Sequence, residues 1–269
     1  MNLFANSKRM VIKVGTSTLT YDTGLVNIRR IEAFVRVMSD IANSGREIIL
    51  VSSGAIAVGC GKLNIPQKPK DIPSRQAAAA VGQIELMHIY DTEFSKYNHN
   101  AAQVLLTMDC VGNGRRQNVI NTFRRLLELR SIPIVNENDT VATDELEGDN
   151  FGDNDTLSAI VADLVDADTL ILLSDIDGLF ESNPRIDPDA KLIPVVEKID
   201  EHIESIASGS GSIRGTGGMS TKIQAARIAT EAGIDMAIIN GSDPLLLYAL
   251  LDGKQVGTRF SAKRPKEAK

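Results

Sequence analysis

The sequence predicts an α/β protein built on a mostly parallel sheet that lies between helices. Segments with the apolar pattern of buried strands alternate with segments of helical spacing along most of the 269 residues. Turns rich in glycine and hydroxyl residues follow several of the strand segments, at the edge where open α/β sheets bind their ligands. Both observations favour a ligand-binding α/β domain.

The individual elements follow from apolar runs and from helical periodicity. Strands are expected at 10–14, 47–51, 101–107, 132–135, 169–173 and 192–195, with a last core strand at 234–239. Helices are expected at 28–41, 74–94, 115–129, 157–165, 201–207 and 219–232. Gly45 ends the first helix, and Ser74 is expected to cap the second, after a loop that holds Pro66, Pro69 and Pro73.

Composition excludes several classes of protein. A net charge of −6 argues against a general nucleic-acid binder, because such proteins present a basic face to phosphates. No apolar stretch is long enough to span a membrane, so no membrane partner is expected. Cys60 and Cys110 lack the spacing of zinc ligands and are too few for a disulfide framework, which predicts a cytoplasmic protein.

Lys13 stands in a strand whose other positions are apolar. This strand ends at Val14 and is followed at once by Gly15 and three hydroxyl residues. Because an unpaired ammonium is costly to bury, we expect an anion beside it. The alternative is that Lys13 lies near the strand end and reaches solvent, with Gly15 serving only a tight turn.

An acidic stretch follows the strand at 132–135. Its two ends, Asn136–Asp139 and Asp153–Asp155, adjoin a buried strand and an apolar helix, whereas 144–149 reads as a solvated loop. A carboxylate at a helix start also stabilises the helix dipole, by about 0.3–1 kcal/mol. Their position at strand ends nevertheless favours a functional role.

The glycine- and serine-rich segment 208–218 leads into Lys222 at the start of a helix. Such composition is typical of a flexible linker, but backbone amides, hydroxyls and a helix N-terminus also make an anion site. Known phosphate-loop, dinucleotide and calcium-loop patterns are absent, and the three histidines occur in unrelated contexts. The remaining set suits phosphoryl transfer, with Lys13 and Lys222 flanking the phosphoryl group, glycine amides holding its oxygens and Asp155 fixing both ammonium groups.

Six motifs occur in order along the sequence. They are Lys13-Val-Gly-Thr-Ser, Val51-Ser-Ser-Gly-Ala-Ile-Ala, Asn136-Glu-Asn-Asp, Phe151-Gly-Asp-Asn-Asp, Ser174-Asp-Ile-Asp-Gly-Leu and Gly215-Thr-Gly-Gly-Met-Ser-Thr-Lys. Together they resemble the amino acid kinase family. The resemblance implies a three-layer α/β/α sandwich in a single domain at 1–262, with an acceptor lobe at about 1–165 and an ATP lobe at about 166–262. A basic tail at 263–269 follows, and the additional C-terminal PUA-like domain of many relatives is not expected.

The resemblance also implies roles for single residues. Lys13, Lys222 and Asp155 match the catalytic residues of the family, with Asp153 a neighbour of Asp155 in the same motif. The contacts to the acceptor match Ser53, Asp139 and Asn154. The ATP contacts match Lys13, Gly15, Ser174, Asp175, Thr216, Gly217, Gly218, Met219, Ser220, Thr221 and Lys222. Ser174 stands where the family commonly has threonine, a change that keeps the hydroxyl.

Within the family, the motifs are most similar to those of members that phosphorylate the side-chain carboxylate of L-glutamate, the first step of proline synthesis. The resemblance implies ATP and Mg²⁺ as cofactors, with the metal held mainly by the nucleotide and not by protein side chains. It further implies a homo-oligomer and proline as a feedback inhibitor.

Two alternatives stay open at this point. The first is a sister kinase for aspartate, acetylglutamate or UMP. The carboxylate of Asp139 suits a free α-ammonium, which acetylglutamate and UMP lack, but aspartate differs from glutamate only by one methylene, a difference worth about 1–3 kcal/mol. The second is a non-catalytic sensor, against which the retention of Lys13, Asp155 and Lys222 argues.

Overall fold

The computed structural model describes residues 4–21, 23–111, 114–142, 154–208 and 218–263. Its strands are β1 (Arg9–Val14), β2 (Glu47–Val51), β3 (Asn100–Leu106), β4 (Ser131–Glu137), β5 (Thr169–Ser174), β6 (Val195–Val196), β7 (Asp235–Asn240) and β8 (Thr258–Phe260). Its helices are the 3₁₀ turn η1 (Phe4–Asn6) and α1 (Thr16–Leu19), α2 (Ile28–Asn43), α3 (Ala55–Lys62), α4 (Ile72–Ser95), α5 (Met108–Val111), α6 (Arg116–Glu128), α8 (Asn154–Leu164), α9 (Glu201–Ser208), α10 (Met219–Glu231) and α11 (Leu246–Leu251).

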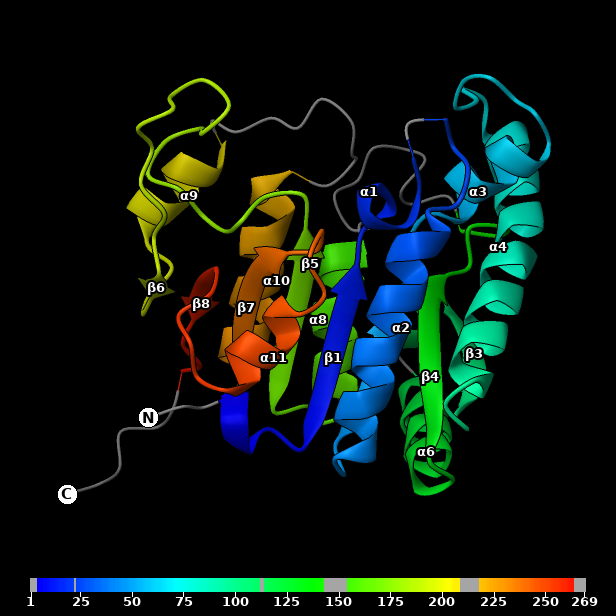
Figure 1. Ribbon diagram of the computed structural model, residues 1–269, viewed down its shortest axis with the longest axis horizontal. Helices are drawn as coiled ribbons and strands as arrows, with labels where there is room; N and C mark the ends of the chain where they lie inside the picture. The colour runs from blue at the N-terminus through cyan, green and yellow to red at the C-terminus, as the bar shows by residue number, and fades with distance from the viewer. Residues whose placement is uncertain (1–3, 22, 112–113, 143–153, 209–217, 264–269) are drawn as a thin grey trace.

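The strands of the described residues form one sheet in the order β3-β4-β2-β1-β5-β7-β8-β6. Neighbouring strands are parallel except for β7 and β8, which are antiparallel. The predicted mostly parallel sheet is therefore confirmed. Figure 1 shows β1 and β5 side by side in the middle of the molecule, so the two halves of the chain meet at the centre of one continuous sheet.

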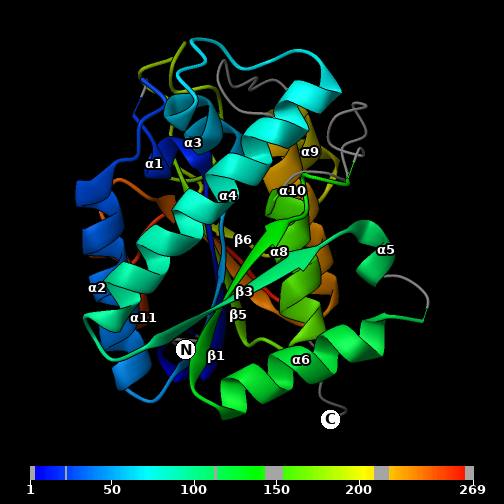
Figure 2. The ribbon, with the colours of Figure 1, turned by 90° about the vertical axis from the view of Figure 1, so that its right-hand side faces the viewer.

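Helices cover both faces of the sheet, which confirms the three-layer α/β/α arrangement (Figure 2). One buried apolar cluster joins α2, α3, α4 and α11 to one face, and a second joins α6, α8 and α10 to the other. Because side chains alternate along a strand, β1 serves both clusters. Met10, Ile12 and Val14 belong to the first and Val11 to the second. This alternation directs Lys13, two residues after Val11, toward α8 and α10.

Two helix boundaries rest on local capping chemistry. Asn27 accepts a hydrogen bond from the amide of Arg30 at the start of α2. The prediction that Ser74 caps α4 is wrong. Asp71 is the N-cap, and its side chain accepts a hydrogen bond from the amide of Ser74. Pro73 therefore lies inside the first turn of the helix, where the missing amide hydrogen is not needed.

The structure contains elements that the sequence pattern does not predict. The hydroxyl and glycine turns after β1 and β2 run into the helices α1 and α3. The strand at 234–239 is not the last, because α11 and β8 follow it, and β8 closes against β7. The strand expected at 192–195 is shifted to Val195–Val196, and Leu192 makes an isolated bridge with Phe180. Strands of two or three residues are too short to show a period.

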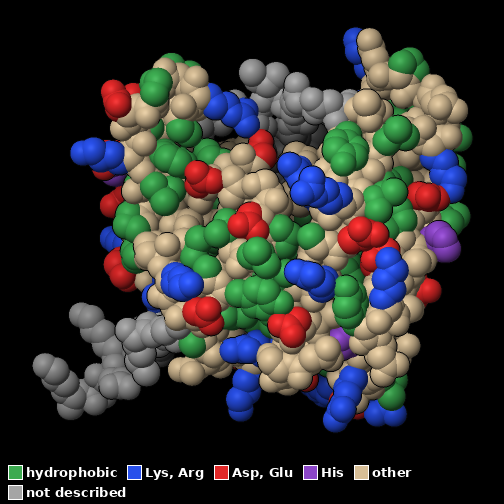
Figure 3. Space-filling model, in the orientation of Figure 1, with side chains coloured by type: hydrophobic (Ala, Val, Ile, Leu, Met, Phe, Trp, Pro, Cys, Tyr) green, Lys and Arg blue, Asp and Glu red, His purple; other side chains and the backbone are tan. Residues whose placement is uncertain are grey.

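Acidic and basic side chains are interspersed over the face of the molecule that carries α2 and α11 (Figure 3). Neither sign of charge dominates this face. Among the helices of the described residues, none has the length and apolar character needed to cross a membrane.

Candidate active site

Lys13 points from the central strand β1 toward the first turns of α8 and α10. Only 7% of this residue is exposed, so the lysine is buried and does not reach bulk solvent. Its Nζ lies 2.6 Å from Oδ1 of Asp155 in the first turn of α8. The expectation of an anion beside Lys13 is thereby confirmed, and the anion comes from the chain itself.

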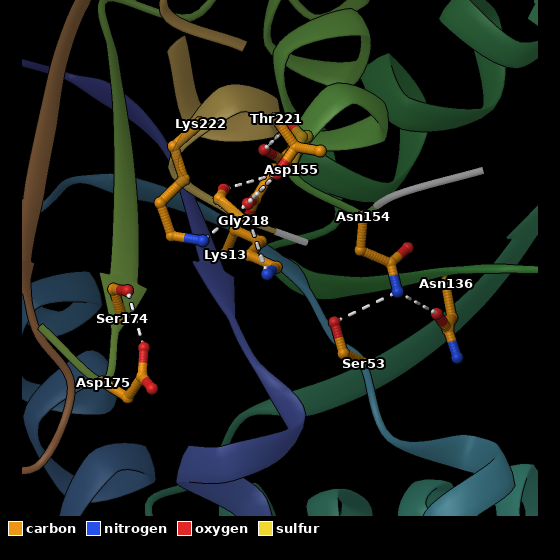
Figure 4. Close-up of polar contacts among 11 residues, drawn as sticks. Lys13, Ser53, Asn136, Asn154, Asp155, Ser174, Asp175, Gly218, Thr221 and Lys222 are labelled. Carbon is orange, nitrogen blue, oxygen red and sulfur yellow. Dashed lines mark hydrogen bonds and ion pairs between the residues drawn. The ribbon is translucent and has the colours of Figure 1, made fainter. Parts of the chain in front are cut away.

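Lys222 reaches the same carboxylate from α10. Its Nζ lies 2.9 Å from Oδ2 of Asp155 (Figure 4). The lysine is 8% exposed and the aspartate 0%. The two lysines thus hold one carboxylate between them, each on its own oxygen. Two ammonium groups and one carboxylate give these three side chains a net charge of +1. Such a cluster is suited to receive a further anionic group.

The ionisation of Asp155 depends on these partners. Burial by itself raises the pKa of this carboxyl group, but the ammonium groups of Lys13 and Lys222 outweigh burial and hold the pKa below its ordinary value of 3.8. Asp155 is consequently a carboxylate at neutral pH. A charged Asp155 in turn fixes the positions of both ammonium groups.

The first turn of α10 supports the cluster from a second direction. The Oγ1 of Thr221 lies 3.2 Å from Oδ2 of Asp155 and 2.9 Å from the backbone oxygen of Gly218, so its hydroxyl can donate to one of them. Thr221 thus lies against Asp155. Its expected contact with ATP stays a prediction. Ser220 is exposed on the same turn, and Gly218 is the N-cap of α10.

A pocket of about 560 Å³, its open mouth included, lies next to Lys222. Ser174, Asp175, Gly218, Met219 and Lys222, all expected nucleotide contacts, line it. Ile176 and Leu179 of the same motif as Ser174 also line it. Residues outside the motifs complete the lining; they are Phe180, Ser182, Asn183, Pro184, Arg185 and Ile206. The pocket combines apolar walls with the cationic side chains of Lys222 and Arg185, a combination that suits a nucleotide.

Asp175 at this pocket is paired with Arg185, whose Nη2 lies 2.9 Å from its Oδ2. The Oγ of Ser174 donates to the other oxygen, Oδ1, over 3.3 Å. The loop that follows β5 is thereby tied to the strand end. Sequence reasoning did not identify Arg185, because an arginine in a proline-containing loop has no distinctive pattern.

Gly15 is the N-cap of the short helix α1 and has a φ of −84°, so its backbone conformation does not require glycine. A Cβ at this position would lie 3.7 Å from Nζ of Lys13. The absence of a side chain therefore keeps open the space beside the ammonium group. This observation favours a ligand at Gly15 over a simple tight turn.

Two of the three residues expected to contact the acceptor, Ser53 and Asn154, come together on the other side of the lysine cluster. Nδ2 of Asn154 donates to Oγ of Ser53 over 3.1 Å and to Oδ1 of Asn136 over 3.1 Å (Figure 4). Ser53 precedes Gly54, whose φ of +93° in the left-handed region turns the chain from β2 into α3. Asn154 is the neighbour of Asp155 in α8, so one helix start serves both groups.

Asp139 lies after the end of β4, at the same edge of the sheet, and is partly exposed. Asn136, which the motif contains but to which no role was assigned, is buried and central to the acceptor group. Asp153, Thr216 and Gly217 fall outside the described residues, as do 144–149 and most of the glycine-rich segment.

The described residues contain no group of three or more histidine, cysteine or carboxylate side chains placed to hold a metal ion. The lysine cluster and the adjoining pocket fit a triphosphate, because the ammonium group of Lys222 belongs to the cationic cluster and Lys222 also lines the pocket.

Comparison with known proteins decides the family. The model of the amino acid kinase family matches residues 8–240. The chain belongs to this family. A glutamate 5-kinase from Clostridium perfringens (strain 13 / Type A) is 57% identical over 261 residues, which are 96% of this chain and 97% of that relative. A glutamate 5-kinase from Listeria innocua serovar 6a is 54% identical over 261 residues, 96% of this chain and 95% of the relative.

Solved structures of other kinases share the fold of this amino acid kinase. An isopentenyl phosphate kinase superposes with a TM-score of 0.63 at 19% identity and covers 94% of this chain and 100% of its own. The UMP kinase from Bacillus anthracis gives a TM-score of 0.63 at 18% identity, with 96% and 97% covered. These identities are low, so the likeness concerns the architecture alone.

Proposed function

We propose that this chain transfers the γ-phosphoryl group of ATP to the side-chain carboxylate of L-glutamate and forms L-glutamyl 5-phosphate, the first step of proline synthesis. The observation that carries the reaction class is the pair of buried lysines that share Asp155 between the nucleotide pocket and the acceptor group. Glutamate as the acceptor rests on the relatives, which are named glutamate 5-kinases at 54–57% identity over nearly the whole chain.

Lys13 and Lys222 bind the transferred phosphoryl group from its two sides in this proposal. Phosphoryl transfer asks little covalent chemistry of a protein, and neutralising the charge on the phosphoryl oxygens lowers the barrier. Asp155 keeps both ammonium groups in place. The acceptor is already an ionised carboxylate and therefore a nucleophile, so no general base is needed.

The remaining expected contacts divide between the two substrates. The nucleotide occupies the pocket lined by Ser174, Asp175, Gly218 and Met219, with Gly15 leaving space beside Lys13. Ser53, Asp139 and Asn154 bind glutamate, the carboxylate of Asp139 pairing with its α-ammonium. Mg²⁺ stays with the ATP phosphates and neutralises part of their charge.

The proposed acceptor lobe and ATP lobe correspond to the two halves of the sheet, which meet where β1 pairs with β5. Residues 1–165 contain β1 to β4 and the acceptor group, and residues 166–262 contain β5 to β8 and the nucleotide pocket. This division supports an acceptor half and an ATP half within one domain at 1–262. A homo-oligomer and inhibition by proline stay predictions from the family. Both cysteines are free thiols, which supports the predicted cytoplasmic location.

The test is ATP turnover with L-glutamate, L-aspartate, N-acetylglutamate or UMP, in the presence of hydroxylamine. Hydroxylamine converts an acyl phosphate into a hydroxamate, so trapped product identifies both the reaction and the acceptor. We expect glutamate-dependent release of ADP with hydroxamate. Turnover of aspartate alone would overturn the assignment of glutamate as the acceptor. ATP binding without turnover of any acceptor would favour the alternative of a non-catalytic sensor.

A further inference from the structure

A chain of three side-chain amides links α4 to the acceptor group. It starts at the backbone amide of Glu137 in β4, which donates to Oδ1 of Asn136 over 2.9 Å. Nδ2 of Asn136 donates in turn to Oε1 of Gln83 over 2.9 Å, and Oδ1 of Asn136 also accepts from Asn154. Gln83 lies on α4, is 8% exposed and carries no expected role.

The backbone donor fixes the orientation of every amide in this chain. Because the amide of Glu137 can only donate, Asn136 must present its oxygen to it. Asn136 then presents its NH₂ group to Gln83, which must accept through Oε1. The same oxygen of Asn136 requires Asn154 to approach with Nδ2. None of the three amides can flip without breaking a hydrogen bond.

Two polar atoms are left over by this arrangement. Nε2 of Gln83 and Oδ1 of Asn154 are both buried and have no hydrogen-bond partner among the described residues. A buried donor without a partner is unfavourable. An apolar side chain at position 83 would remove that donor but would leave Nδ2 of Asn136 unpaired instead. What the glutamine adds is a fixed orientation of Asn136.

We propose that Gln83 is a positioning residue for the acceptor amino acid. By accepting from Asn136 it keeps Asn136, and through it Asn154, in the orientation that leaves Oδ1 of Asn154 as an acceptor for the ammonium group of the substrate. Figure 4 shows this oxygen pointing away from the Lys13–Asp155–Lys222 cluster. An extended amino acid with its side-chain carboxylate at the lysines carries its ammonium group at that far end. The inference rests on the proposed function.

The test compares Gln83→Leu with the wild-type chain and with Tyr90→Phe. Leucine removes the acceptor for Asn136, so Asn154 is no longer held with Oδ1 toward the ammonium group of the substrate. Because one hydrogen bond to a charged group is then lost, we expect the KM for glutamate to rise about tenfold. The KM for ATP should change less than about twofold. Gln83→Glu keeps an oxygen facing Asn136 and should restore part of the loss. If Gln83→Leu does not fold, Gln83→Met takes its place with the same expectations.

Tyr90→Phe is the matched control because it lies on the same helix and removes a buried hydrogen bond, the one to Ser52, outside the amide chain. We expect it to lower the melting temperature and leave both KM values unchanged. An unchanged KM for glutamate in Gln83→Leu, or equal rises for glutamate and ATP, would overturn the positioning role. Absence of glutamate turnover in the wild-type chain overturns the proposed function instead, and the acceptor it does use then replaces glutamate in the comparison.

Discussion

At the scale of single residues, the chain places two lysines where lysines are rarely found. Both are more than nine-tenths buried, and each is compensated by one oxygen of Asp155. Removing one partner of a buried ion pair is more disruptive than the net contribution of the pair, because the other charge is left in a dry site. Substitutions here are therefore best made with side chains of similar length.

Lys13→Met and Lys222→Met test the roles of the two ammonium groups. Each substitution keeps the length of the side chain and removes one charge from the phosphoryl site, so we expect kcat to fall by roughly 10²–10³-fold. The control is Lys263→Met, which removes a lysine from an exposed pair with Glu231 and should leave kcat unchanged. A variant of Lys13 or Lys222 with near-normal kcat contradicts the two-lysine mechanism.

Gly15→Ala tests whether the space beside Lys13 belongs to a ligand. The φ of −84° accommodates alanine and the added Cβ meets no atom closer than 3.7 Å, so we expect a normal melting temperature. The methyl group occupies the space next to Nζ of Lys13, and we expect weaker ATP binding as a result. Calorimetric titration with ATP measures this directly. An unchanged affinity for ATP would mean that Gly15 serves only the turn after β1.

At the scale of elements, the acceptor side depends on the close packing of α3 against α4. Gly82 of α4 lies so near α3 that a Cβ would overlap the backbone oxygen of Ala55, and Gly59 of α3 stands in the same relation to Ala78. These glycines let the two helix backbones approach. The contact holds the turn at Ser53 and the side chain of Gln83 in one unit.

Gly82→Ala is expected to force the two helices apart. Overpacking of this kind costs about 1–3 kcal/mol in the free energy of unfolding, and the displaced turn should raise the KM for glutamate more than that for ATP. Denaturant titration together with steady-state kinetics measures both effects. Ala80→Ser, at an exposed position on the same helix, is the control. Equal stability of Gly82→Ala and the wild-type chain would show that α3 can move without cost.

At the scale of the whole molecule, Asp155 links stability to pH. Its pKa in the folded chain lies below the ordinary value of 3.8, so the unfolded chain binds the proton more tightly. The stability that this carboxylate contributes is therefore present above about pH 4 and is lost as the pH falls toward the lower, folded pKa. Acid should destabilise the wild-type chain through this group.

Asp155→Asn removes this dependence. We expect the melting temperature of the wild-type chain to fall more steeply than that of Asp155→Asn between about pH 5 and pH 3, although the variant is less stable at neutral pH. Thermal unfolding at a series of pH values measures the difference. Parallel curves would mean that the carboxyl group titrates normally in the folded chain.

Long elements and strand-end motifs were predictable, because buried strands and amphipathic helices impose a period over many residues. The strand at 47–51 agrees with β2, and the helix at 115–129 agrees with α6 within one residue at each end. Short elements such as α5 and β8 were not predictable, since three or four residues carry no period. Asp71 as the cap of α4 was missed because Ser74 is an equally good capping residue by type.

The sequence by itself determined the class of fold, the mostly parallel sheet and the residue types of the lysine cluster, because these depend on local patterns and on motifs in order. Only the tertiary structure decided which atoms meet. It assigned one oxygen of Asp155 to each lysine, turned Thr221 toward that carboxylate, and brought Gln83 to Asn136 from 53 positions away along the chain. Contacts between distant segments depend on how helices pack on the sheet, and no local pattern encodes that packing.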